Sequence, residues 1–210
     1  MKLILLHGIG QSTDSWKEVI KNIDNSDICL FPLFENIGPN EYVNFKYLNN
    51  KLEAFLRTLN EPFILCGLSL GAILTLQYGT VCNPLLKGLI VVAGQFEAPD
   101  KKILKLQNMM LKLTPSFFLR KSGIVLKKKQ LLQLMDDLAN LQMSNSLQNI
   151  KAPTLLLCGS KDKANLSATS KLSNLLKNST IVIIENGKHE LNRSSPEELA
   201  YTINRFTQEM

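Results

Sequence analysis

Residues 65–71 read Leu-Cys-Gly-Leu-Ser-Leu-Gly, and this stretch does most to decide the fold. The apolar run 62–66, which begins at a proline, is typical of a buried strand. Good helix formers occupy 72–78 and favour a helix directly afterwards. A serine between two glycines, at a turn from a strand into a helix, is the context of a nucleophile elbow, where a strained turn exposes the hydroxyl above the sheet edge. The pattern therefore makes Ser69 a candidate nucleophile.

A serine hydroxyl becomes a good nucleophile only when a base takes its proton and an acid orients that base. The chain has two histidines, His7 and His189. His189 follows the β-branched run 181–184 and a polar turn that contains a glycine. Open α/β sheets carry their chemistry in the loops beyond the carboxyl ends of their strands. We therefore predict that His189 is the base.

The candidate acid has a similar position. Asp162 lies in a polar loop after the buried run 153–159, so it also follows the carboxyl end of an expected strand. Glu97 and Asp100 are alternatives, because they follow the neighbouring apolar run 89–93. We favour Asp162 and keep the other two carboxylates open at this point.

The order of these residues along the chain is Ser69, Asp162, His189, which is the order found in α/β-hydrolases. The N-terminal strand 2–6 runs into His-Gly-Ile-Gly at 7–10, an H-G-x-G loop. With these motifs, nearly the whole sequence resembles the α/β-hydrolase superfamily.

The resemblance implies an oxyanion hole made of two backbone N–H groups, those of Ile9 and Leu70. Their side chains are free to line a pocket. It also implies that His7 has a structural role inside its loop and takes no part in the chemistry.

The expected fold class is α/β, with a parallel sheet of about six strands and helices on both faces. It is a trimmed α/β-hydrolase fold, because no room precedes residue 2 for the two antiparallel strands that open the full fold. Strands are expected near 2–6, 27–31, 63–66, 87–93, 154–158 and 180–184. Helices are expected near 14–23, 43–59, 71–81, 166–177 and 196–207.

Residues 97–151 interrupt the alternation of strands and helices, where α/β-hydrolases commonly insert a cap. We expect a core of 1–96 and 152–210, and a small helical cap insertion at 97–151 with helices near 99–113, 115–121 and 127–144. The cap segment holds 10 Lys or Arg and 4 Asp or Glu, so it carries the chain's whole net charge of +6.

The cap is also rich in apolar residues, and we expect Met109, Phe117 and Phe118 to bind substrate. Two interpretations of its lysines remain open. They form an ordinary solvated face, or they form a basic rim that favours an apolar substrate with an anionic end or loose contact with anionic lipid. The lysines in question are Lys127, Lys128 and Lys129, then Lys101, Lys102 and Lys105.

Composition and the spacing of residues argue against several other classes of protein. With 210 residues, of which 45% are hydrophobic, one α/β core can form without a second domain. The N-terminal apolar run stops at His7, short of a signal peptide, and no stretch has the roughly 18 apolar residues of a membrane span. The four cysteines, at 29, 66, 82 and 158, show no metal-ligand spacing and indicate reduced thiols in the cytoplasm. We expect no metal, no cofactor and no nucleic-acid partner.

The resemblance and the candidate triad together predict a serine esterase or thioesterase, a hydrolase whose partner is a small-molecule acyl ester or thioester. Two alternatives stay open. The same triad serves C–C bond hydrolases or lyases among similar proteins, and a ligand-binding or sensory homologue would have little turnover.

Overall fold

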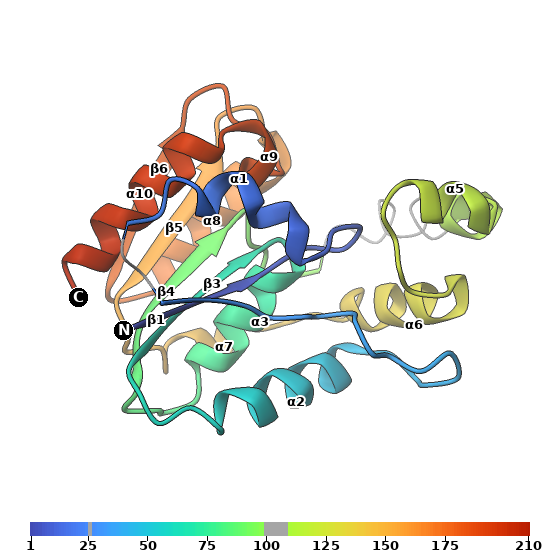
Figure 1. The fold of residues 1–210 in the computed structure, drawn as a ribbon, viewed down its shortest axis with the longest axis horizontal. Helices are drawn as coiled ribbons and strands as arrows, with labels where there is room; N and C mark the ends of the chain where they lie inside the picture. The colour runs from blue at the N-terminus through green and yellow to red at the C-terminus, as the bar shows by residue number, and fades with distance from the viewer. Residues whose placement is uncertain (25–26, 99–108) are drawn as a thin grey trace.

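The computed structural model describes residues 1–24, 27–98 and 109–210, and its central feature is a parallel sheet (Figure 1). Six strands of the described residues lie in the order β2-β1-β3-β4-β5-β6, and every neighbouring pair is parallel. This confirms the expected fold class. The strands are β1 (Lys2–Leu6), β2 (Asp27–Leu30), β3 (Phe63–Leu68), β4 (Leu86–Val92), β5 (Thr154–Gly159) and β6 (Ser179–Ile184).

Helices cover both faces of the sheet, because alternate strand residues point to opposite sides. In β1, Ile4 and Leu6 belong to one buried cluster, while Leu3 and Leu5 belong to the other. The first cluster is covered by α2 (Phe45–Leu56), α3 (Leu70–Gly79), α6 (Lys128–Leu138), α7 (Ser144–Leu147) and α8 (Lys163–Leu175). The second is covered by η1 (Thr13–Trp16), α1 (Lys17–Ile20), α9 (Leu191–Ser194) and α10 (Pro196–Gln208). None of the helices in the described ranges is long and apolar enough to cross a membrane.

The order of the strands creates a crevice at one end of the sheet. The chain passes from β1 to β2 on one side and then returns to place β3 on the other side of β1. Loops leaving the carboxyl ends of β1 and β3 therefore diverge, which is the topological switch point where open α/β sheets bind ligands. Ile9 follows β1 and Ser69 follows β3, so both lie at this point.

The long connection between β4 and β5 contains the segment expected to form a cap. Residues 109–113 are helical, and α5 (Ser116–Lys121), α6 and α7 follow. Figure 1 shows α5 and α6 at the end of the molecule opposite the two termini. Most of the helix expected at 99–113, with Lys101, Lys102 and Lys105, lies outside the described residues.

The helix expected at 127–144 ends early, at Leu138. The backbone beyond it pairs with the segment after β4: Ala98 N–H donates to the Leu141 carbonyl at 2.9 Å, and Met143 N–H donates to the Phe96 carbonyl at 3.0 Å. These bonds between distant segments replace the local helical bonds. They also turn Leu141 toward the crevice.

Candidate active site

Ser69 sits in a strained turn between β3 and α3. Its φ of 55° and ψ of −112° lie in a region that side-chain-bearing residues rarely adopt. The turn is held because Ser69 N–H donates to the Val92 carbonyl of β4 at 2.9 Å. Two residues later, at Gly71, there is no room for a side chain. A Cβ on this glycine would lie 2.5 Å from the Leu6 carbonyl oxygen. The glycine therefore lets the start of α3 pack directly against β1.

The structure brings Ser69, His189 and Asp162 together at hydrogen-bonding distances. His189, in the loop between β6 and α9, has its Nε2 3.1 Å from Ser69 Oγ and its Nδ1 2.8 Å from Asp162 Oδ2. The Asp162 side chain is 6% exposed, whereas that of His189 is 44% exposed. A carboxylate only accepts, so Nδ1 carries the proton and Nε2 is free to accept the Ser69 hydroxyl.

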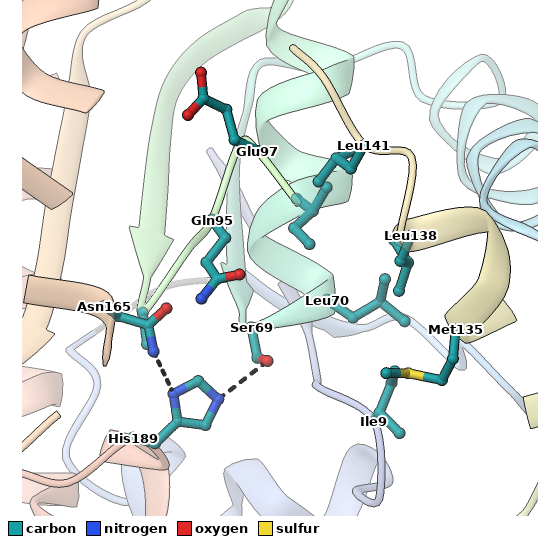
Figure 2. A pocket seen from close by; sticks show the side chains of 12 residues that line it. Ile9, Ser69, Leu70, Gln95, Glu97, Met135, Leu138, Leu141, Asn165 and His189 are labelled. Atoms are coloured by element: carbon teal, nitrogen blue, oxygen red, sulfur yellow. Dashed lines mark hydrogen bonds between the residues drawn. The ribbon is translucent and has the colours of Figure 1, made fainter. Parts of the chain in front are cut away.

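Sequence reasoning missed a fourth member of this cluster, Asn165. It lies in the first turn of α8, three residues after Asp162, so the two side chains share one helix face. Its Nδ2 donates to both Asp162 carboxylate oxygens, at 2.9 and 2.8 Å, and lies 3.1 Å from His189 Nδ1 (Figure 2). The spacing Asp-x-x-Asn at a helix start was the signal that could have identified it.

The alternative carboxylates do not contact the imidazole within the described structure. The ring nitrogens of His189 hydrogen-bond to Ser69 and Asp162, and the Asn165 amide is the other polar group that lies close to the ring. Glu97 is exposed, and its Oε1 accepts from Ser144 Oγ at 2.6 Å. Asp100 lies outside the described residues. Of the two carboxylates that the structure describes, Asp162 and Glu97, Asp162 is the one that the fold brings to His189.

The two expected oxyanion donors both border the Ser69 site. Leu70 is the first residue of α3, so its N–H has no intrahelical acceptor and adds to the positive end of the helix. Ile9 lies in the loop after β1. The side chains of both residues line the cavity at Ser69.

A buried pair of amides, also missed by the sequence reasoning, joins the Ile9 loop to the His189 loop. Gln11 Nε2 donates to Asn192 Oδ1 at 3.3 Å, and Asn192 Nδ2 donates back to Gln11 Oε1 at 3.2 Å. Gln11 Oε1 also accepts from Gly8 N–H at 3.4 Å. Because Asn192 is three residues after His189, this pair ties the loop that contains Ile9 to the loop that contains His189.

His7 is packed inside its own loop, away from solvent. Its ring is completely buried, and Nδ1 donates to the Gly8 carbonyl at 2.9 Å. Burial lowers the pKa of His7, although the Gly8 carbonyl and Glu35 oppose the shift. The ring therefore stays neutral at pH 7 and does not contact Ser69.

A cavity of about 230 Å³ opens beside Ser69 and His189. Its apolar lining comes from several elements, namely Ile9, Leu70, Ile73, Met135, Leu138 and Leu141. Gln95, Glu97 and Asn165 form the polar part. In Figure 2, Gln95 points toward Ser69 and His189, while the carboxylate of Glu97 points away from them.

The residues expected to bind substrate do not line this cavity, which is a correction to that expectation. Met109, Phe117 and Phe118 are 52%, 71% and 56% exposed. The reason is the position of α6, which presents Met135 and Leu138 to the cavity while α5 lies further out (Figure 1).

The charged residues around the cavity differ from those of the cap segment 97–151, which is strongly basic. Among its lining residues, His189 and Glu97 are the ionisable ones, and none of the lysines takes part. A basic rim at the cavity is therefore not seen in the described residues. The same part of the chain contains no group of three or more His, Cys, Asp or Glu that could hold a metal ion, and all four cysteines are free.

Solved structures of other proteins share this fold. The chain is similar in structure to MenH from S. aureus, with a TM-score of 0.84, 18% identity, and coverage of 100% of this chain and 94% of that one. It is also similar to a lipase-esterase related protein from Clostridium acetobutylicum, with a TM-score of 0.81, 17% identity, and coverage of 98% and 93%. A thermophilic esterase from Thermogutta terrifontis gives a TM-score of 0.83, 16% identity, and coverage of 100% and 90%. At these identities the likeness concerns the fold.

One curated relative is an L-allo-isoleucyltransferase from Pseudomonas savastanoi pv. glycinea, 34% identical over 79 residues. That match spans 37% of this chain and 28% of the relative's length. A wider match comes from the sequence model of the alpha/beta hydrolase family, which covers residues 3–200. The chain therefore belongs to the alpha/beta hydrolase family.

Proposed function

We propose that this protein is a serine hydrolase that cleaves a carboxylic ester or thioester through an acyl-enzyme. The observation that carries the proposal is the chain of hydrogen bonds from Asp162 through His189 to Ser69, beside a largely apolar cavity. Membership of the alpha/beta hydrolase family and the likeness in fold to an esterase support the same reaction class.

In the proposed reaction, Ser69 Oγ attacks the acyl carbon while His189 Nε2 accepts its proton. Asp162 holds the ring in the required tautomer and stabilises the imidazolium that forms. The backbone N–H groups of Ile9 and Leu70 donate to the developing oxyanion. His189 then returns the proton to the departing alcohol or thiol, and water, activated by the same ring, releases the acid.

The two parts of the cavity suggest how a substrate lies. The apolar side chains of Met135, Leu138 and Leu141 form a wall for the acyl chain. Gln95 and Asn165 lie on the other side of Ser69, where they can hydrogen-bond to a polar leaving group (Figure 2). In this proposal residues 97–151 act as the cap, because α6 closes the acyl side.

A second candidate is acyl transfer, which the similarity to an acyltransferase favours. The first half-reaction would be the same. The acyl-enzyme would then react with an alcohol, amine or thiol in place of water. Measuring how the acyl group divides between water and an added thiol separates transfer from hydrolysis.

The test is labelling with a fluorophosphonate, followed by turnover of short p-nitrophenyl esters. We expect Ser69→Ala to abolish both labelling and turnover, while Ser170→Ala, an exposed serine on α8, retains both. Removal of a triad nucleophile typically costs on the order of 10⁶-fold in kcat. Labelling without turnover of any ester or thioester would redirect the assignment to C–C bond substrates. Absence of labelling would point to a ligand-binding homologue.

A further inference from the structure

Large apolar side chains are exposed on one short part of the connection between β4 and β5. Each is more than half exposed: Met109, Met110, Leu113, Phe117, Phe118 and Val125. The rings of Phe117 and Phe118 pack edge to face on each other, with centroids 5.7 Å apart. Large apolar side chains that gather on an exposed segment often mark a binding surface.

The same stretch is exclusively basic in charge. Residues 109–129 contain no Asp or Glu, and their cations are Lys112, Arg120, Lys121, Lys127, Lys128 and Lys129. All are exposed except Lys128, whose Nζ donates to the Lys112 and Thr114 carbonyls at 2.6 and 2.9 Å. We refer to residues 109–129 as the 109–129 surface.

The opposite side of this segment is anchored, so the exposed side chains cannot simply turn inward. Leu119 and Leu126 are buried against the core. The turn after α5 also packs closely on the loop of Ile9, since a Cβ on Gly123 would lie 2.5 Å from the Gly10 carbonyl oxygen. The side of the segment that packs on the core is therefore fixed, and the exposed side chains stay on the opposite side.

The proposed reaction does not account for this surface. None of its apolar or basic side chains lines the cavity at Ser69, where the acidic residue is Glu97. Its lysines thus have no role in holding an anionic end of the substrate at the catalytic serine. Except for Lys128 they are exposed, and α5 lies at the end of the molecule opposite the termini (Figure 1).

We propose that the 109–129 surface docks on an anionic lipid bilayer. Its phenylalanines and methionines enter the boundary between headgroups and acyl chains, while the basic side chains approach the lipid phosphates. Composition favours lipid over an acidic protein. Phe and Met are common at both kinds of surface, but protein interfaces are depleted in Lys, whereas five of the six cations of this surface are Lys.

The test is co-sedimentation of the full chain with phosphatidylcholine vesicles, with and without phosphatidylglycerol. We expect binding to the anionic vesicles that weakens as salt rises, and little binding to the neutral ones. The combined change Arg120→Gln, Lys121→Gln and Lys127→Gln should weaken binding on the order of a hundredfold. Phe117→Ser together with Phe118→Ser should weaken it at least about tenfold.

Control variants remove comparable side chains elsewhere on the protein. Lys87→Gln, Lys171→Gln and Lys177→Gln remove three exposed charges outside the surface, and Tyr201→Ser removes an exposed aromatic ring of α10. Neither control should alter vesicle binding by more than about twofold, apart from the small general effect of net charge. Circular dichroism and turnover of a small dissolved ester should be unchanged in every variant, which shows that each is folded.

Three outcomes would overturn the proposal: equal binding to neutral and anionic vesicles, equal losses in the controls, or no vesicle binding. A concentration-dependent dimer that the Phe117→Ser and Phe118→Ser variant loses would instead assign the surface to a second copy of the chain. Binding is measured without turnover and can be repeated with Ser69→Ala. Failure of the docking proposal is therefore distinguishable from failure of the proposed reaction.

Discussion

Replacing Asp162 by Asn tests the proposal that this carboxylate orients His189 as the base. In the native protein both of its oxygens accept, from His189 Nδ1–H at 2.8 Å and from the Asn165 amide at 2.9 and 2.8 Å. In Asp162→Asn one oxygen becomes an NH₂ donor that faces a donor on either side. If the NH₂ faces His189, the ring adopts the tautomer with its proton on Nε2. That nitrogen then cannot accept the Ser69 proton.

The expected loss in kcat is on the order of 10⁴-fold, the cost of the wrong tautomer in a triad. This corresponds to about 5 kcal/mol of transition-state stabilisation. If the NH₂ instead faces Asn165, a buried donor is left unpaired, which lowers the free energy of unfolding by about 1–3 kcal/mol. The two effects separate when ester turnover and urea denaturation are measured on the same preparation.

The matched control is Glu97→Gln, the same chemical change at the alternative carboxylate. Glu97 is exposed and bonded to Ser144, so we expect less than about a twofold change in kcat/KM. An Asp162→Asn variant that loses less than about tenfold in kcat, or a Glu97→Gln variant that loses more than it, would refute the assignment of the acid.

Three further measurements test the close packing at Gly71, the burial of His7 and the lining of the cavity. Gly71→Ala places a Cβ 2.5 Å from a backbone oxygen and should lower the free energy of unfolding by about 3 kcal/mol, whereas Gly38→Ala, which meets only a flexible side chain, should cost much less in urea denaturation. Burial lowers the pKa of His7, so the unfolded chain binds more protons as the pH falls below the ordinary value of about 6.5. The free energy of unfolding should therefore fall from about pH 8 to about pH 5, and His7→Asn should show a smaller fall. Leu138→Phe makes the cavity narrower on the side proposed for the acyl chain, and should reduce kcat/KM for longer p-nitrophenyl esters by about 10–200-fold relative to shorter ones. Phe117→Ala, at an exposed residue outside the cavity, should leave the chain-length preference unchanged.

The fold could be predicted from the sequence because the patterns that indicate its strands involve only neighbouring residues. Buried parallel strands appear as short apolar runs, and all six expected strands are present close to their expected bounds. The expected helix at 127–144 was wrong beyond Leu138. There, the Leu141 carbonyl accepts from Ala98 N–H and Met143 N–H donates to the Phe96 carbonyl, and these bonds compete with the helix. Nothing in the local pattern indicates a partner more than forty residues away.

The candidate site also contains residues that the sequence predicted and residues that it did not. Ser69 and His189 were identified because each follows a recognisable strand and because the chain has few histidines. Asn165 and the pair of Gln11 with Asn192 were missed, since an amide side chain has no distinctive sequence pattern. Their roles arise from contacts that close only in three dimensions.

By itself, the sequence determined the α/β class, the serine at the elbow and the order of the candidate triad. These follow from periodicity and from turn residues, which act over a few neighbours in the chain. The tertiary structure decided which carboxylate meets His189, because that depends on how the loops beyond β4 and β5 approach the ring. It also decided that α6 lines the cavity while Phe117 and Phe118 face outward. Both outcomes depend on packing between distant segments, and an apolar residue looks the same in the sequence whether it lines a cavity or lies on the surface.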